Sequence, residues 1–443
     1  MSLQPYTRPL EKPGRGEGQL RRAIGLPTLT ANIVNMTIGA GIFVLPAVVA
    51  GGLGAAAPVA YLICGGLMGL IVACFAAAGS RVSLTGGLYA YIEVAFGPFV
   101  GFLAGVLFWL TAAFAVASVA SALAGSMGAL APALDGRVAR AVLIASFFAG
   151  LALVNARGVT SGSRVVQVVT AAKLLPLAIF VVSGIWFVDA AALRWPGTPG
   201  LAAVGRTSII LIYAFAGVEI ALVPSGEMRD PARTVPRAVF AALAISTILY
   251  LLIQTVAQGL LGASLTSYPT APLAEAASRV LGETGRTIIL VGATISMFGY
   301  LSGDMLGSPR ALFAFGRDGV LPEPFARVHP TFRTPHVAIA IHAIVVAVLA
   351  ISSTFTELAI LANVAALTLY GTSVVAAAEL QRRDVRSDGP PLTLPGGPVI
   401  PLLAVAVIVW MLSHATRREF AVEALVLGLS AAFYSIRKRG GQR

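Results

Sequence analysis

Three ionisable side chains, Lys173, Glu219 and Asp304, stand inside long apolar segments of this sequence. Such residues are costly in a bilayer and usually serve binding or proton transfer. Each also has a structural interpretation. A lysine can extend its ammonium to the membrane interface along its apolar stem, an acid at Glu219 can bind freed backbone donors, and Asp304 can pair with hydroxyl or backbone groups. The residue types therefore indicate proton or substrate chemistry in apolar surroundings.

Glycines interrupt two of the apolar segments. The first interruption is Thr37–Phe43, with the sequence TIGAGIF, and the second is Tyr213–Glu219, with the sequence YAFAGVE. Each glycine weakens a helix by about 1 kcal/mol. Small residues are also common where membrane helices pack closely, so either segment alone fits both interpretations. The two segments together favour a pair of broken helices.

A broken membrane helix leaves N–H and C=O groups unpaired, and these are tolerated only beside protein or a wet cavity. The N–H groups around Gly39–Ile42 would open a second half-helix and suit a carboxylate. The carbonyls around Thr37 and Tyr213–Phe215 suit an ammonium. A free amino acid carries both groups, so the pattern predicts an amino acid site.

The composition indicates what kind of element carries these residues. The 443 residues are 57% hydrophobic and 11% charged, and the mean hydropathy is +0.86. Soluble domains carry about 25% charged residues. The sequence therefore predicts an all-α integral membrane protein rather than a soluble enzyme or a disordered chain. The net charge of +12 is then attributed to basic loops and not to nucleic-acid binding.

The chain contains twelve apolar segments that predict twelve transmembrane helices. The interrupted spans are the first and the sixth, a spacing that fits two five-helix repeats of inverted topology. We expect a tail at 1–26, a first repeat at 27–187, a second repeat at 205–380, two further spans at 398–436 and a tail at 437–443. The individual spans are expected at 27–51, 56–79, 98–128, 138–154, 163–187, 205–226, 236–261, 286–315, 336–353, 356–380, 398–415 and 420–436.

The distribution of basic residues predicts the orientation. Most of the 31 Lys and Arg residues fall on the side of the N-terminus, which favours two cytoplasmic termini. Arg417 and Arg418 oppose this bias, so the last hairpin is the weakest part of the topology. Residues 1–26 contain no apolar core, so no cleavable signal is expected there.

Four sets of motifs carry a family likeness, and together they resemble the amino acid–polyamine–organocation (APC) transporter superfamily over residues 27–380. Within it, the first and sixth spans are most similar to bacterial amino acid permeases. The motifs are Ile38–Pro46; Thr85–Tyr91 with Ala95–Pro98; Phe215–Glu219 with Glu227–Ala238; and Arg310–Pro322 with Arg333–Pro335.

The resemblance implies alternating access, with a substrate held by the backbone of spans 1 and 6. It implies that Lys173 replaces a sodium ion and can bridge carbonyls near Gly39 to span 8, that Tyr213 caps the substrate and that Asp304 contacts its side chain. Phe108 and Trp109 are weaker pocket candidates. The predicted substrate-binding residues are Thr37, Ile38, Gly39, Ala40, Gly41, Ile42, Tyr213, Ala214, Phe215, Ala216, Gly217 and Asp304, and the predicted proton-coupling residues are Lys173 and Glu219.

We therefore expect a secondary transporter of amino acids in the bacterial inner membrane, coupled to protons and independent of sodium. The alternative is an exchanger of basic amino acids or amines, for which Asp304 is the main support. An ion channel, the third hypothesis, would need a continuous pore lining. A membrane-bound enzyme is disfavoured, because the sequence has no ATPase-type phosphate loop and no Gly-x-Ser elbow in a strand–turn–helix context. No catalytic residue, metal site, cofactor or nucleic-acid partner is expected, and the sequence does not determine the oligomeric state.

Overall fold

The computed structural model describes residues 24–82, 84, 86–157, 163–195, 197–222, 228–317, 319–386 and 390–440. In these ranges the regular structure is helical, and extended pairing is limited to an isolated bridge between Ile24 and Met228. Most of the predicted N-terminal tail, the final residues 441–443 and the motif residue Glu227 lie outside the described ranges.

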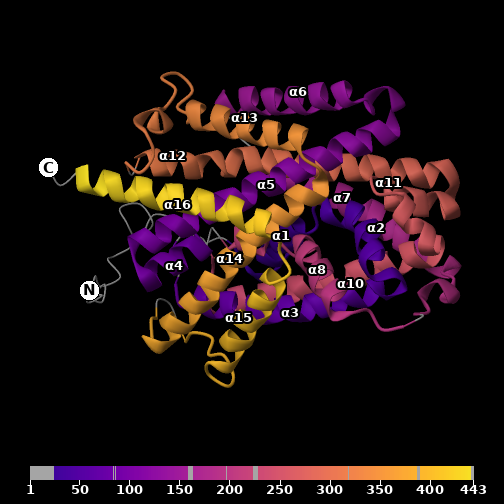
Figure 1. Cartoon of the computed structure of the whole chain (residues 1–443), viewed down its shortest axis with the longest axis horizontal. Coiled ribbons are helices and arrows are strands. Elements are labelled where there is room, and N and C mark those ends of the chain that lie inside the picture. The colour runs from indigo at the N-terminus through magenta and orange to yellow at the C-terminus, as the bar shows by residue number, and fades with distance from the viewer. Residues whose placement is uncertain are drawn as a thin grey trace.

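The helices before residue 200 are α1 (Leu26–Thr37), α2 (Gly41–Leu53), α3 (Ala57–Gly79), α4 (Leu88–Phe96), α5 (Pro98–Leu130), α6 (Arg137–Ala156) and α7 (Ser163–Gly184). Those after it are α8 (Leu201–Leu211), α9 (Val218–Ala221), α10 (Pro231–Leu261), α11 (Pro272–Gly307), α12 (Pro309–Arg317), α13 (His336–Ser352), α14 (Phe355–Arg382), α15 (Val399–Leu412) and α16 (Arg417–Gly440). Many of the helices, such as α6, α11, α12 and α13, lie along the long axis of the view, whereas α14 and α15 are inclined to it (Figure 1).

Local sequence signals explain where several of these helices begin. Pro98, Pro231 and Pro272 each stand in the first turn of a helix, where a missing backbone N–H costs nothing and the fixed φ angle is already helical. Helix α14 begins with a capping box, in which Thr354 and Glu357 each accept a hydrogen bond from the other's backbone N–H.

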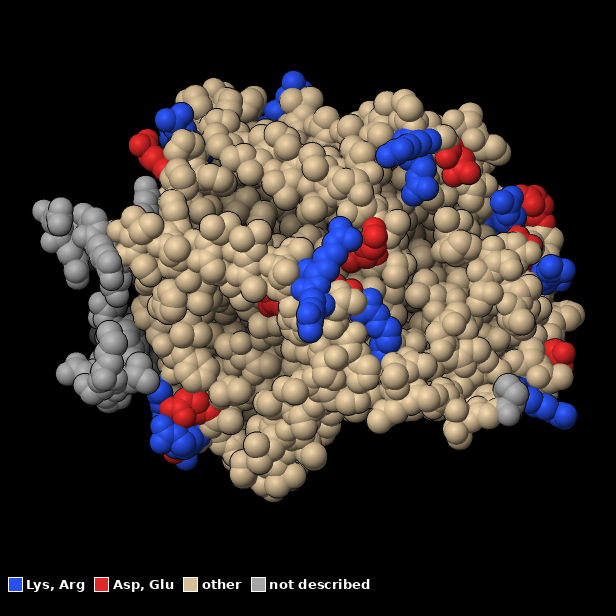
Figure 2. Space-filling view, viewed as in Figure 1, with Lys and Arg blue, Asp and Glu red and all other residues tan. Residues whose placement is uncertain are grey.

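The outer surface is suited to lipid. Seven helical stretches of the described residues are long and apolar enough to span a membrane by length and composition, and four shorter helices are apolar as well. Large apolar side chains such as Leu402, Leu425 and Leu429 are exposed on α15 and α16. Charged side chains form a few small groups between wide uncharged areas (Figure 2). The chain is therefore a multi-pass, all-helical membrane protein, whereas the count of twelve spans stays a prediction.

Three predicted spans differ from the observed helices. The segments 27–51 and 205–226 are each divided, because residues 38–40 and the stretch around Phe215–Gly217 leave the α-helical conformation. The segment 286–315 ends early, because Pro309 starts the separate helix α12. Its helix also extends further toward the N-terminus, across a kink at Gly282, where φ is 60°.

Helices α5 and α14 are the most deeply buried of the long helices, and they pack against each other through the middle of the molecule. Helices α7 and α11 pack together beside them. At their crossing a Cβ atom on Gly292 would lie 2.5 Å from Cγ of Pro176, closer than any real contact. The absence of a side chain at Gly292 therefore sets how near α7 comes to α11.

Replacing Gly292 with Leu should force α7 and α11 apart and destabilise the fold by about 1–3 kcal/mol, the usual cost of overpacking. We expect a lower apparent Tm for the detergent-purified protein in a thermal-shift assay. Gly303→Leu is the matched control on the same helix, since a Cβ at Gly303 meets nothing within 4 Å. Equal Tm values for the two variants would contradict this account of the packing.

Candidate functional site

The first interruption lies between α1, which ends at Thr37, and α2, which begins at Gly41. Ile38 has φ −80° and ψ 81°, outside the helical region, so the chain turns there instead of continuing the helix. The first N–H groups of any helix have no partner within it, and those of Gly41 and Ile42 open α2. This end of α2 therefore provides backbone donors in the interior of the protein, where Gly41 and Ile42 are both buried.

Lys173 of α7 binds the carbonyl side of the same interruption. Its Nζ donates a hydrogen bond to the carbonyl oxygen of Ile38 at 2.9 Å and another to that of Asn35. Lys173 is buried, with 5% of its surface exposed, so it does not extend to the interface. The contact near Gly39 agrees with the role that the resemblance implies. In the described part of the chain, no hydrogen bond joins Lys173 to α11.

The second interruption follows α8. The chain passes through a 3₁₀ turn, Ile212–Ala214, and reaches Gly217 with φ 114° before α9 begins at Val218. A side chain at Gly217 would be strained at this φ, and its Cβ would lie 2.6 Å from the carbonyl oxygen of Met36. Glycine at 217 therefore lets the second interruption contact the backbone of α1 directly.

Glu219 holds the second interruption in shape. Its Oε2 accepts hydrogen bonds from the backbone N–H of Gly217 at 2.9 Å and from the hydroxyl of Tyr370 on α14 at 2.8 Å. Glu219 is 3% exposed. These contacts correspond to the structural interpretation of this acid, and they do not test its predicted part in proton coupling.

Tyr250 of α10 joins the two interruptions, and the sequence analysis did not identify it. Its hydroxyl lies 2.9 Å from the carbonyl oxygen of Thr37 and 2.8 Å from that of Ala214. Its single hydrogen is shared between these acceptors. Asn363 of α14 also binds a buried backbone carbonyl: its Nδ2 donates a hydrogen bond to the carbonyl oxygen of Ile209 in α8 at 2.7 Å. A tyrosine or asparagine in an apolar span has no local signal that reveals such a partner.

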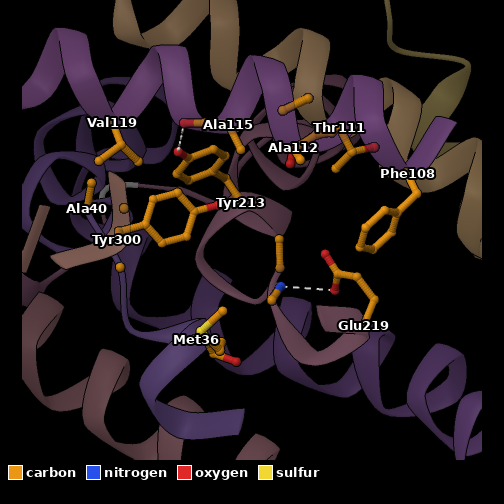
Figure 3. A pocket seen from close by; sticks show the side chains of 17 residues that line it. Met36, Ala40, Phe108, Thr111, Ala112, Ala115, Val119, Tyr213, Glu219 and Tyr300 are labelled. Atoms are coloured by element: carbon orange, nitrogen blue, oxygen red, sulfur yellow. Dashed lines mark hydrogen bonds between the residues drawn. The ribbon is translucent and has the colours of Figure 1, made fainter. Parts of the chain in front are cut away.

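A cavity of about 40 Å³ lies where the interruptions meet α5, α11 and α14. In Figure 3, Tyr213 and Tyr300 lie toward one end of it and Glu219 and Phe108 toward the other. The hydroxyl of Tyr213 donates to the carbonyl oxygen of Ala115 at 3.1 Å and shares a hydrogen bond with Ser118. The lining residues are Met36, Thr37, Gly39, Ala40, Gly41, Phe108, Thr111, Ala112, Ala115, Val119, Tyr213, Ala216, Gly217, Glu219, Tyr300, Ala362 and Asn363.

The predicted substrate-binding residues divide into two groups. Thr37, Gly39, Ala40, Gly41, Tyr213, Ala216 and Gly217 line the cavity, whereas Ile38, Ile42, Ala214, Phe215 and Asp304 do not. In the second group, the first four are buried beside the cavity. The carbonyl of Ile38 binds Lys173 and that of Ala214 binds Tyr250.

Asp304 differs most from its predicted place. Its Oδ2 lies 2.8 Å from Nε2 of His342 on α13, and its Oδ1 accepts a hydrogen bond from Ser308. Tyr300, one helical turn earlier on α11, lines the cavity in its place. The helical period explains the difference, because a residue four positions along α11 can point to α13 as readily as to the cavity. Asp304 thus does not line the cavity, and its contact with a substrate side chain stays a prediction.

Comparison with known proteins places these features among transporters. Residues 24–419 match the family described as amino acid permease. The serine/threonine exchanger SteT of Bacillus subtilis is 28% identical over 440 residues, covering 95% of this chain and 98% of that protein. The methylthioribose transporter of Bacillus subtilis is 26% identical over 417 residues, covering 89% and 88%. An uncharacterized transporter of Mycobacterium tuberculosis is 32% identical over 358 residues, covering 74% and 73%.

Tyr250→Phe should destabilise the contact between the interruptions. The ring stays, but the buried carbonyls of Thr37 and Ala214 lose a donor, at a cost of about 1–3 kcal/mol. We expect a lower Tm in detergent and weaker ligand binding. Tyr61→Phe is the matched control, because Tyr61 packs edge-to-face against Tyr250 with 6.0 Å between ring centroids, while its own buried hydroxyl has no hydrogen-bond partner among the described residues. A Tyr250→Phe protein as stable as Tyr61→Phe would show that the shared hydroxyl does not join the breaks.

Proposed function

This chain belongs to the amino acid permease family, and we propose that it is a secondary active transporter that moves amino acids across the membrane by alternating access. The family and the relatives are transporters rather than enzymes, and their bacterial members indicate the plasma membrane. The single observation that carries the proposal is the crossing of two helix interruptions beside a buried cavity.

The backbone at the crossing suits a zwitterion. The N–H groups that open α2 near Gly41 lie at the positive end of a helix dipole and attract a carboxylate. The carbonyls that end α8 and its 3₁₀ turn, near Tyr213, attract an ammonium. Both Gly41 and Tyr213 line the cavity, so one small molecule can contact both. We infer that the α-carboxylate and α-amino group of an amino acid bind here.

The cavity favours a small neutral amino acid. One water needs about 10–15 Å³ of such space, so about 40 Å³ corresponds to roughly three or four water-sized groups in all, which favours the smallest substrates. Thr111, Ala112 and Ala362 make part of the wall. Among the lining residues that the structure describes, the one carboxylate is Glu219, and it is already held by Gly217 and Tyr370. A cationic side chain would therefore find no free acid.

We propose protons as the coupling ion, with Lys173 in the place of a metal cation. An ammonium that binds the carbonyls of Asn35 and Ile38 removes the need for sodium there. Exchange is the second candidate, and the similarity to a serine/threonine exchanger along almost the whole chain favours it. Exchange of basic substrates loses its main support, because Asp304 is paired with His342.

The inverted five-plus-five repeat, two additional helices and two cytoplasmic termini belong to the same proposal. The interruptions after α1 and between α8 and α9 support this layout, because inverted repeats place broken helices at corresponding positions. In Figure 1, α4, α12 and the C-terminal end of α16 lie at the same end of the molecule. Arg310 on α12 and the loop residues Arg327 and Arg333, at this end, would face the cytoplasm.

Transport into proteoliposomes tests the proposed function. We expect saturable uptake of small neutral amino acids from a labelled panel that also contains basic amino acids and methylthioribose. Uptake is measured with and without a pH gradient, with and without internal amino acid, and in sodium-free buffer. Gly41→Val is the inactive control, because a Cβ there lies 3.1 Å from the Tyr213 ring. Linear, unsaturable flux, or transport of methylthioribose alone, would contradict the proposal.

Lys173→Ala should abolish accumulation driven by an imposed pH gradient. The substitution removes both hydrogen bonds to the first interruption and the only titratable ammonium near it among the described residues. Counterflow of labelled substrate in the same vesicles checks that the variant is folded. Unchanged accumulation would mean that Lys173 has no part in coupling.

A further inference from the structure

A second buried polar cluster lies behind the wall of the cavity. It consists of Asp304 on α11, His342 on α13 and Trp109 on α5. The Asp304–His342 distance is 2.8 Å, and the indole N–H of Trp109 donates to Nδ1 of His342 at 3.2 Å. The side chain of His342 is fully buried and that of Asp304 is 7% exposed. The proposed transport mechanism uses none of these three residues.

Trp109 sets the state of the imidazole. An indole nitrogen is a donor only, so Nδ1 of His342 must be an acceptor without a proton. The one proton of the neutral ring then lies on Nε2 and is donated to the carboxylate of Asp304. In this arrangement the ring is neutral and the cluster carries one negative charge. The second carboxylate oxygen is already occupied by the hydroxyl of Ser308.

The nearby elements do not neutralise this charge. Helix α5 has no ionisable side chain, α13 has His336 six residues before His342, and α11 has Tyr300 one turn before Asp304. The first basic residue that follows Asp304 in the sequence is Arg310 on α12, and it is exposed. The basic residues of α6 are Arg137 and Arg140, near its start. Among the described residues, no Lys or Arg forms an ion pair with Asp304.

One more proton would remove the charge and change the contacts. If it binds to Nδ1, the imidazolium N–H faces the indole N–H of Trp109, and two donors cannot share a hydrogen bond. If it binds to Asp304, the acid no longer accepts as strongly from Nε2 of His342. Proton uptake thus weakens a link between helices in either case. No other bond is made or broken; the proton is taken from the aqueous phase, and Asp304, at 7% exposed, is the less buried member of the pair.

The cluster is connected to the cavity through two helices. Phe108 and Thr111 line the cavity on either side of Trp109 in the sequence of α5, and Tyr300 lines it one turn from Asp304 on α11. A change in the Trp109–His342 contact would therefore alter how α5 packs against α13, and α5 also lines the cavity.

We propose that the Asp304–His342 pair, with Trp109 as the residue that sets its tautomer, is a proton-binding site whose occupancy is linked to transport. The site is separate from the substrate cavity and from Lys173. This inference rests on the proposed function, since it concerns the coupling of that same transport cycle.

The test compares His342→Gln, Trp109→Phe and the control His336→Gln, a histidine on the same helix outside the pair, in proteoliposomes. Two quantities are measured: counterflow of a transported amino acid against external pH, and its accumulation under a pH gradient. We expect His342→Gln to keep counterflow at a pH-independent rate and to lose most of the accumulation. Trp109→Phe removes the donor to Nδ1 and should give a pH profile of counterflow that differs from that of the wild type. His336→Gln should match the wild type.

The outcomes separate this inference from the proposed function. If the wild type transports no amino acid, the proposed function fails. If it exchanges amino acids but does not accumulate them, symport fails and the pH profiles of counterflow decide the role of the pair. A His342→Gln protein with the wild-type pH profile overturns the inference. If His342→Gln does not reconstitute, an unshifted profile in Trp109→Phe overturns it.

Discussion

The structure depends on one constraint, which is that backbone groups freed inside a bilayer must find partners within the protein. Two helices are interrupted at the same depth, and Gly217 brings their backbones into contact beside Met36. Most of the buried polar side chains around this point serve the carbonyl groups or the N–H groups of the interruptions. Tyr250, Lys173 and Glu219 come from different parts of the chain and meet at this crossing.

The same constraint decides what remains for a substrate. Lys173 and Tyr250 occupy carbonyls of the first interruption, and Glu219 occupies a backbone donor of the second. The N–H groups that open α2 face the cavity without such partners in the helix. A substrate that binds here as proposed would complete a set of hydrogen bonds that the protein has only partly satisfied. Its carboxylate and amino group, rather than its side chain, would then supply most of the contacts.

The three buried ionisable residues have three different surroundings. Lys173 is compensated by carbonyl dipoles, Glu219 by a backbone N–H and a tyrosine hydroxyl, and Asp304 by a histidine and a serine hydroxyl. None of them forms an ion pair with another of the three. Each of the three side chains is therefore stabilised by its own neighbours. A change in the protonation of one of them alters the contacts between the helices that this residue joins, and has little direct effect on the other two residues.

The amino-acid sequence by itself determined the class of the protein, the positions of most helices and the two interruptions, because these follow from local properties: apolar length, proline and glycine positions, and the cost of a lone charge. It also indicated Lys173 and Glu219 as unusual. Only the tertiary structure decided their partners. Tyr250, Asn363, Tyr370 and His342 look like ordinary residues of apolar spans, and their roles arise from contacts with residues far away in the chain. For Asp304 the sequence indicates only that a buried carboxylate needs a partner. The rotation of α11 about its axis directs this side chain to His342 rather than to the cavity. That rotation is set by the packing of several helices at once.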